Sequence, residues 1–279
     1  MNTDVPTRPE PDDQLLAHDA HWRWTVVDDS QWRIGWETER EKTRHREFVE
    51  QHVEPDEKGL CLAPPILVDD EQRALTVEAS TARPLSSIDW TEQPTPVIAT
   101  IFDNLGTTLR QVHELRSPSG FGDGIAGNPF HTFNAFMAAH FTELSRRSQR
   151  LENEILRETA VESLAALRQE LSAFHPHGKS TWTVGHLAPS RLAVQTKPAG
   201  LVALMDLGST GLRPPEYDLA ALHIYRLLDV VPAADRAFWR GYDAARTCDL
   251  RRRISYFERL IELERLLGSP SILVSQRPS

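Results

Sequence analysis

The chain has 279 residues, of which 40% are hydrophobic and 25% are charged, a composition typical of a soluble globular protein with one large domain or two modest ones. Its formal net charge of −9 argues against a general binder of nucleic acids or anionic membranes, because phosphate contacts need a basic face. No apolar run approaches membrane-spanning length, and the start lacks a basic signal region. Cys61 and Cys248 fit no metal-binding or redox spacing. We therefore expect a cytoplasmic protein without a nucleic-acid or membrane partner.

Residues 21–84 predict a small β-rich part. Residues 1–20, rich in Pro and Asp, precede it and are expected to form a loose tail. Alternating apolar residues and turn residues predict a first hairpin, with a strand from His21, a turn at 28–30 and a returning strand that ends at Trp36. A charged helix is predicted over 37–53. A second hairpin, formed by 66–68 and 74–77, and a linker at 79–84 follow it.

Four tryptophans belong to the first predicted hairpin, namely Trp22, Trp24, Trp32 and Trp36. Two interpretations remain open for them: a binding face on the hairpin, or packing against the neighbouring helix. Because a hairpin buries one of its sides, packing accounts for at least two of the four.

Residues 85–279 predict a larger and mostly helical part. The periodicity is strongest over 132–147, where apolar residues recur at i, i+3, i+4, i+7, i+8 and i+11. The other predicted elements are helices over 98–115, 160–171 and 254–267, further helices from Tyr217, and strand segments over 181–194 and 201–207. His175 and His177 flank Pro176 without a third ligand in view and are interpreted as part of a loop.

Three segments in the second half of the chain carry the most information. They are Thr183-Val-Gly-His-Leu-Ala-Pro-Ser-Arg-Leu-Ala-Val194, Leu204-Met-Asp-Leu-Gly208 and Gly211-Leu-Arg-Pro-Pro-Glu-Tyr-Asp-Leu-Ala220. In order and spacing they resemble the catalytic core of the aminoglycoside phosphotransferase and choline kinase-like family. In that family a His-Gly-Asp-Leu-His-Pro-Gly-Asn loop is followed by a strand that ends in Asp-Phe-Gly, and then by a Gly-Asp-Pro-x-x-Asp-Leu-Ala segment. Leu75-Thr-Val-Glu78, which precedes Arg83-Pro-Leu85, is similar to the family's hinge.

The resemblance covers roughly residues 20–265 and implies an α+β, two-lobed protein-kinase-like fold. The reduced β-rich N-lobe would span residues 21–84, and the large helical C-lobe would span residues 85–279. In such a fold a carboxylate accepts the proton of the attacking hydroxyl, while an Asn and a second Asp hold the metal ions. A lysine grips the phosphates, and a Gly-rich loop covers them.

The chain departs from that pattern in four places. His186 stands at the position of the catalytic Asp, and Arg191 stands at the position of the metal-binding Asn, where a fixed positive charge repels a metal ion. The N-lobe has neither a Gly-rich loop nor a lysine on a predicted strand. Arg33, the nearest cationic substitute, and Glu47, its expected ion-pair partner, are candidate ligand-binding residues. These departures argue against ATP and magnesium as cofactors, with Asp206 as the metal ligand that the pattern retains.

A functional and a structural interpretation remain open for most of these residues. His186 is either a hydrogen-bonded loop residue or a general base, since an imidazole can shuttle protons near neutral pH. Asp206 either holds a metal ion or caps the local turn, and Arg191 either pairs with Asp206 or binds an anionic ligand. Asp218 matches a family Asp that braces the catalytic loop, and Glu78, in the hinge, is expected to contact a ligand.

The favoured hypothesis is a pseudokinase that lacks conventional phosphoryl transfer and binds a peptide, a small molecule or a partner enzyme in the cleft between its lobes. The resemblance places such proteins in bacterial natural-product pathways, including the biosynthesis of ribosomal peptides. A specific form of this hypothesis is repurposed chemistry, such as peptide cyclisation by thiol addition to a dehydrated residue, with His186 as general base. The alternative is an active ATP-dependent small-molecule phosphotransferase with displaced catalytic residues. A third hypothesis is a structural subunit with an empty cleft.

Overall fold

The computed structural model describes residues 23–28, 31–36, 38–52, 66–71, 73–78, 81–122, 130–173, 180–185 and 187–268. The predicted tail at 1–20, together with Trp22, His175, His177 and His186, lies outside these residues. Within the described helices, none combines the length and the apolarity needed to cross a bilayer.

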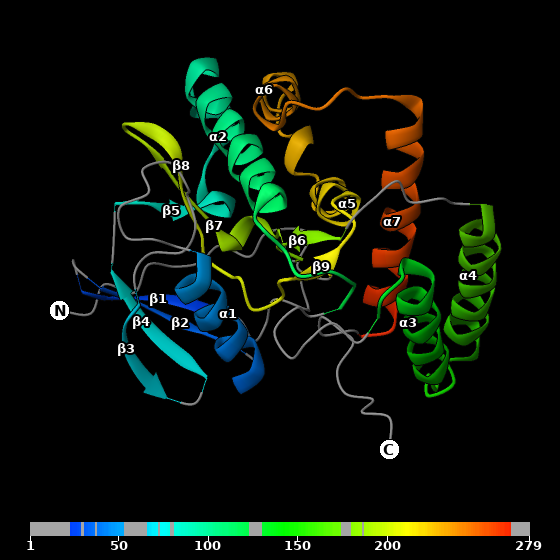
Figure 1. Cartoon of the computed structure of the whole chain (residues 1–279). Helices are drawn as coiled ribbons and strands as arrows, with labels where there is room; N and C mark the ends of the chain where they lie inside the picture. Colours follow the sequence, from blue (N-terminus) through cyan, green and yellow to red (C-terminus); the bar gives the residue numbers. More distant parts are fainter. Residues whose placement is uncertain are drawn as a thin grey trace.

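A four-stranded antiparallel sheet and one helix make up the N-terminal part (Figure 1). The strands are β1 (Arg23–Asp28), β2 (Gln31–Gly35), β3 (Ile66–Glu71) and β4 (Ala74–Glu78), in the spatial order β1-β2-β4-β3. Helix α1 (Glu39–His52) connects the two hairpins in sequence. Both predicted hairpins and the charged helix are therefore confirmed.

The two faces of this sheet have different chemistry because side chains alternate along each strand. Trp32 is paired with Val77 and Ile34 with Leu75, and all four side chains are buried on one face. Arg33 is paired with Thr76, so these two residues share the opposite face. The buried face forms a separate hydrophobic cluster with Ala193, Ala203 and Met205 from the other part of the molecule.

Within the described residues, the larger part combines two short sheets with six helices. The strands β5 (Arg83–Pro84), β7 (Leu192–Thr196) and β8 (Ala199–Leu204) form one sheet, and β6 (Thr181–Thr183) pairs with β9 (Gly211–Arg213). The helices are α2 (Thr95–Glu114), α3 (Phe133–Ser148), α4 (Glu154–Ala173), α5 (Glu216–Ile224), α6 (Pro232–Tyr242) and α7 (Cys248–Leu266). The described residues also form the 3₁₀ turns η2 (Leu85–Ser87), η3 (Trp90–Glu92), η4 (Pro189–Arg191) and η5 (Leu227–Asp229).

Local sequence signals explain where several of these helices begin. The side chain of Thr132 accepts a hydrogen bond from the backbone N–H of Ala135 at the start of α3, and Thr247 does the same for Leu250 at the start of α7. The six residues that define the predicted apolar stripe of α3 are all buried: Phe133, Phe136, Met137, His140, Phe141 and Leu144. The expected linker at 79–84 differs in one respect, because its last two residues form β5 and pair with β7.

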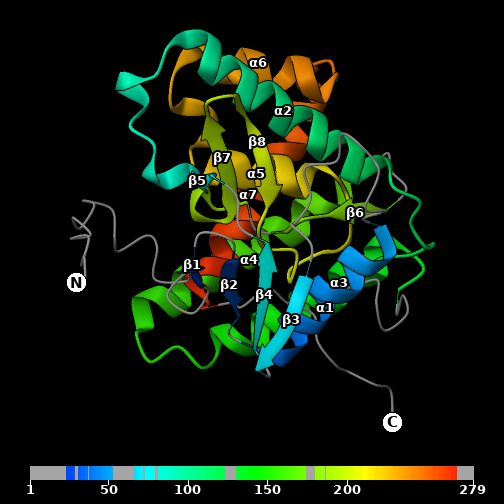
Figure 2. The ribbon, with the colours of Figure 1, turned by 90° about the vertical axis from the view of Figure 1, so that its left-hand side faces the viewer.

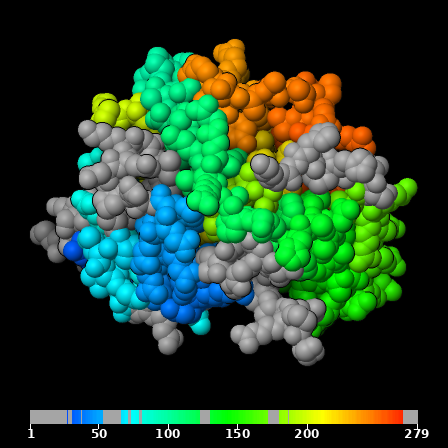
Figure 3. Space-filling view, in the orientation of Figure 1, coloured from blue at the N-terminus to red at the C-terminus, as the bar shows by residue number. Residues whose placement is uncertain are grey.

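Helix α1 connects the two parts. The ring of Phe48 packs edge-on against Trp182 of β6, with 5.2 Å between the ring centroids, and His52 packs against the same indole. On its outer side Lys42 and Arg46 pair with Asp69 of β3, and Figure 3 shows α1 at the surface next to the β3–β4 hairpin. The helix is thus held from both sides, which fixes the small sheet against the larger part (Figure 2).

Helices α2 and α6 approach each other closely through two glycines. A Cβ on Gly106 would lie 2.2 Å from the carbonyl oxygen of Phe238, and a Cβ on Gly241 would lie 2.1 Å from that of Asp103. Only glycine permits such backbone contact. The contact positions the C-terminal end of α2 beside α6, where both helices contribute to the candidate site.

Replacing Gly106 by Ala should destabilise the protein, although Ala is the better helix former by about 1 kcal/mol. The added methyl group would force α2 and α6 apart, and we expect a loss of about 1–3 kcal/mol in the free energy of unfolding, measured by denaturant titration. Thr100→Ala, at an exposed position of α2, is the control and should change stability by at most about 0.5 kcal/mol. Equal stability of the G106A variant and the wild type would contradict the close contact.

Candidate functional site

The carboxylate of Asp206 lies at the junction of the two parts and is 3% exposed. Its Oδ1 accepts hydrogen bonds from Nε1 of Trp36 at 2.8 Å and from the backbone N–H of Gly208 at 2.8 Å. Its Oδ2 accepts a hydrogen bond from Nη1 of Arg191, which is 5% exposed. Both carboxylate oxygens are therefore occupied by donors of the chain itself.

Three separate segments bring these donors together. Trp36 follows the last residue of β2, Arg191 ends the turn η4, and Asp206 follows β8. The backbone N–H of Met205 donates to the carbonyl oxygen of Arg191 at 2.8 Å, so the chain around Asp206 and the chain around Arg191 are joined directly. The ion pair between Arg191 and Asp206, one of the two alternatives open from the sequence, is present.

Helix α1 covers the segment that follows Asp206. The backbone N–H of Leu207 donates to Nδ1 of His45 at 3.1 Å, and Nη1 of Arg44 donates to the carbonyl oxygen of Gly208 at 3.1 Å. A Cβ at Gly208 would lie 2.8 Å from the carbonyl oxygen of Glu41, so this position requires glycine. Asp206 and its neighbours are thereby enclosed between α1 and the larger part.

Burial dominates the electrostatics of this junction. Desolvation lowers the pKa of His45 to about 4, against a weaker opposing effect of the Asp206 charge. Burial also raises the pKa of Glu41, and the nearby Asp206 charge raises it further. His45 is neutral at physiological pH, as its role as an acceptor from Leu207 requires.

The donor set around Asp206 does not fit a magnesium ion. Magnesium takes oxygen ligands in a near-octahedral arrangement. Here the groups that surround the carboxylate are an indole N–H, a backbone N–H and a guanidinium, all of which donate hydrogen bonds and one of which is a cation. Among the described residues, no group of three or more His, Cys, Asp or Glu side chains could hold a metal ion elsewhere.

Asp218, at the first turn of α5, holds the loop after β6. Its carboxylate accepts hydrogen bonds from the backbone N–H groups of Val184 at 2.7 Å and Gly185 at 2.8 Å. Nε2 of His113 lies 3.1 Å from the same carboxylate, and Nδ1 of His113 lies 2.8 Å from the hydroxyl of Tyr242. Asp218 thus braces the loop, as the structural interpretation of the sequence expects, and α2 and α6 support it through His113 and Tyr242.

The expected ion pair between Arg33 and Glu47 was wrong. Arg33 lies on the face of the sheet that carries Thr76, and its Nε donates to Oδ2 of Asp70 at 3.0 Å. Thr76 donates to the same carboxylate, so Asp70 of the neighbouring hairpin takes the place foreseen for Glu47. Oε2 of Glu47 is buried and has no hydrogen-bond partner within the described part of the chain. Glu78 is exposed at the end of β4.

The hairpin tryptophans are partly explained. Trp32 and Trp36 are each 4% exposed and belong to the cluster that joins the sheet to Ala193, Ala203 and Met205. Trp36 also packs against His45, with 4.8 Å between the ring centroids. Packing therefore accounts for two of the four, as expected, and their partners include β7 and β8 as well as α1.

Sequence reasoning missed the contributions of Trp36, Arg44 and His45 to the environment of Asp206. Each contacts a residue that lies more than 160 positions away in the sequence. The only local signal was the position of Trp36 at the end of an alternating strand, which indicates burial but names no partner.

The N-terminal part is an antiparallel sheet with one helix, and the larger part is mainly helical. A strand pair followed by Asp-Leu-Gly and a loop held by Asp218 lie where the two parts meet. This arrangement defines the class of two-lobed kinase-like proteins. The chain belongs to the phosphotransferase enzyme family, whose model matches residues 62–257. The family resemblance and the α+β kinase-like fold expected from the sequence are confirmed. No curated protein matches the chain.

Solved structures of aminoglycoside phosphotransferases share the fold. The GDP complex of aminoglycoside 2′-phosphotransferase-IIIa superposes with a TM-score of 0.62 at 12% identity, covering 89% of this chain and 82% of that one. Aminoglycoside phosphotransferase APH(4)-Ia gives a TM-score of 0.62 at 14% identity, covering 89% and 86%. APH(3′′)-Id from Streptomyces rimosus ATCC10970 gives 0.57 at 17% identity, covering 88% and 93%. At these identities the similarity establishes the fold alone.

Replacing Arg191 by Met should destabilise the protein strongly, because the buried Asp206 carboxylate loses its cationic partner. We expect a loss of about 3–5 kcal/mol in the free energy of unfolding. The double variant R191M/D206N should lose less than the sum of the two single variants, with a coupling of about 1–3 kcal/mol in a double-mutant cycle. Arg240→Met is the surface control, because the Arg240 side chain is 67% exposed and its ion pair with Asp103 should contribute little to stability. Additive effects of R191M and D206N would contradict a direct interaction.

Stability should fall on acidification because the pKa of His45 in the folded protein, about 4, lies below the value of about 6.5 in an unfolded chain. Between these two values the unfolded state binds the proton and the folded state does not, so stability is lost as the pH falls from about 6.5 to about 4. From pH 7 to pH 5 this group should contribute a loss of about 2 kcal/mol.

The measurement is denaturant unfolding at both pH values, compared with a His45→Asn variant. The Asn side-chain oxygen can accept from Leu207 in the place of Nδ1 but does not titrate. The difference in stability between pH 7 and pH 5 should therefore be smaller in the variant. An identical pH dependence in both proteins would show that His45 is not responsible.

Proposed function

We propose that this protein is a pseudokinase, a member of the phosphotransferase enzyme family that does not carry out conventional phosphoryl transfer. The observation that carries the proposal is the saturated environment of Asp206. Phosphoryl transfer in this fold relies on metal ions that neutralise the phosphates. Here Arg191 and Trp36 occupy the carboxylate that would hold such an ion.

The packing between the two parts supports the same proposal. Trp32 and Trp36 fill the space between the small sheet and the β7–β8 strand pair, together with Met205. A ligand there would have to displace buried indole rings from a well-packed cluster, at a cost of several kcal/mol. Nucleotide binding at this position would therefore require a rearrangement of β2 and not only a change of side-chain rotamers.

We further propose that the protein acts by binding, with a peptide, a small molecule or a partner enzyme of a bacterial natural-product pathway as its target. The hydrogen bonds from Val184 and Gly185 to Asp218 support this, because they hold the backbone of the loop that follows β6. Repurposed chemistry such as peptide cyclisation, with His186 as general base, is the catalytic form of this proposal. Its test is a His186→Ala variant, which would retain binding and lose only the reaction.

Titration with ATP or GTP, with and without Mg²⁺, should leave the melting temperature unchanged at millimolar nucleotide. A ligand that binds the native state raises the melting temperature in proportion to its occupancy, so thermal shift is a direct measure. An active aminoglycoside phosphotransferase under the same conditions is the positive control.

A magnesium-dependent shift would overturn the proposal and favour the alternative, an active small-molecule phosphotransferase with displaced catalytic residues. In that case D206N should abolish the shift, because the metal would have to replace Arg191 on that carboxylate. A shift that is independent of magnesium and survives in D206N would indicate nucleotide binding without a metal, which still contradicts conventional transfer.

A further inference from the structure

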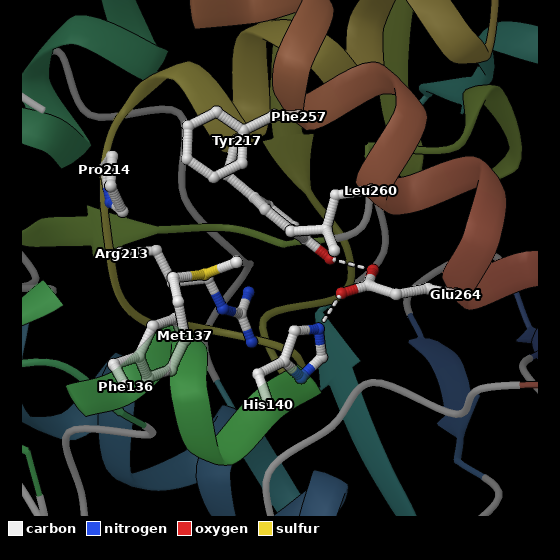
Figure 4. Close-up of a pocket in the computed structure, with 9 residues that line it drawn as sticks. All are labelled: Phe136, Met137, His140, Arg213, Pro214, Tyr217, Phe257, Leu260 and Glu264. Carbon is white, nitrogen blue, oxygen red and sulfur yellow. Dashed lines mark hydrogen bonds and ion pairs between the residues drawn. The ribbon is translucent and has the colours of Figure 1, made fainter. Parts of the chain in front are cut away.

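A small pocket separate from the junction of the two parts lies between α3, α5 and α7, beside the end of β9 (Figure 4). The centre of a water molecule can move within about 10 Å³ of it, which is close to the volume that a single buried water needs and far below that of a site for an organic ligand. The wall is mainly apolar and aromatic, and three polar or charged side chains complete it, namely His140, Arg213 and Glu264.

The carboxylate of Glu264 fixes the tautomer of His140. Its Oε1 lies 2.6 Å from Nε2 of His140, and its Oε2 accepts a hydrogen bond from the hydroxyl of Tyr217 at 2.7 Å. Burial, together with the Glu264 charge, holds the pKa of Tyr217 well above its ordinary value, so the hydroxyl remains a donor. Because an ionised carboxylate only accepts hydrogen bonds, Nε2 of His140 carries the hydrogen.

Nδ1 of His140 is therefore the acceptor nitrogen of the neutral ring. This atom is buried, and no hydrogen-bond partner for it lies among the described residues. The contact of Nε2 with Glu264 holds the ring, which also stacks on Phe136 with 6.2 Å between the ring centroids. Because a buried acceptor without a donor is costly, a donor to Nδ1 is expected within the pocket.

Arg213 faces the same space. It is 6% exposed, and Figure 4 shows its guanidinium directed toward the ring of His140. Nη1 donates to the carbonyl oxygen of Ser209 at 3.4 Å, and Cζ lies 4.8 Å over the ring of Tyr217. A guanidinium has five N–H donors, and the hydrogen bond to Ser209 uses only one of them. Arg213 can therefore donate into the pocket as well.

The chemistry of these two groups selects the molecule that fits between them. Arg213 offers N–H groups and needs an acceptor, whereas Nδ1 of His140 needs a donor. A carboxylate or a halide ion could accept from Arg213 but has no hydrogen to donate to Nδ1, and the guanidinium repels a cation. Water both donates and accepts hydrogen bonds, and it is a molecule that the volume of the pocket admits.

We infer that this pocket is a binding site for one structural water, which accepts a hydrogen bond from Arg213 and donates one to Nδ1 of His140. The bridge joins α3, which carries His140, to the last residue of β9. Arg213 in turn lies against the loop held by Asp218, since a Cβ on Gly185 would be 2.9 Å from its Nη1. The water thereby helps to position the loop that follows β6. This inference does not depend on the loss of phosphoryl transfer, because it concerns different residues.

The experiment is a crystal structure of the full chain at a resolution that shows ordered waters. We expect a density peak about 2.7–3.2 Å from a guanidinium nitrogen of Arg213 and from Nδ1 of His140. A bromide soak should give no anomalous peak there, because a halide cannot donate to Nδ1. In Arg213→Met, which removes the donors, the peak should be lost, whereas it should remain in the surface control Arg240→Met.

The inference would be overturned if the wild type showed no peak at that resolution, if bromide gave an anomalous signal in the pocket, or if R213M retained the peak. Should R213M fail to fold, the wild-type density and the soak still decide the matter, and NMR adds a measurement in solution. A long-range proton–nitrogen correlation spectrum at neutral pH should place the hydrogen of His140 on Nε2, and a hydrogen on Nδ1 would contradict the bridge. None of these results affects the nucleotide titration, so the two proposals fail separately.

Discussion

The ion pair between Asp206 and Arg191 is the interaction on which the junction of the two lobes depends. A buried carboxylate is tolerated only when it is paired and hydrogen-bonded. Asp206 meets that condition with donors from three segments, which are Trp36 after β2, Arg191 in η4 and the backbone of Gly208. Since Trp36 lies 170 positions from Asp206 in the sequence, its hydrogen bond ties the small sheet to the larger part.

Helix α1 follows from the same constraint. Once Asp206 is held, the backbone of the next two residues presents an N–H at Leu207 and a carbonyl at Gly208, and α1 satisfies both through His45 and Arg44. Phe48 extends the contact to Trp182. The Asp206 carboxylate and the two residues that follow it are thus satisfied by side chains and backbone groups of the chain itself.

Local pattern was sufficient to predict the elements but not their partners. Alternation around 28–30 located the first hairpin, and the stripe from Phe133 to Leu144 located α3, because periodicity reports which face is buried. The pairing of Arg191 with Asp206 could be foreseen because the ordered motifs placed a cation at a metal position. The pairing of Arg33 with Asp70 could not, since it depends on which face of β2 the arginine occupies and on the sheet order, neither of which the sequence states.

The two acidic residues of the motif have different roles. Asp218 receives only backbone N–H groups and His113, so its task is mechanical and survives whatever the protein binds. Asp206 is balanced by a cation, which leaves the charge at the lobe junction satisfied internally. Because each of these buried carboxylates is hydrogen-bonded within the chain, both stabilise the folded state without a bound ligand.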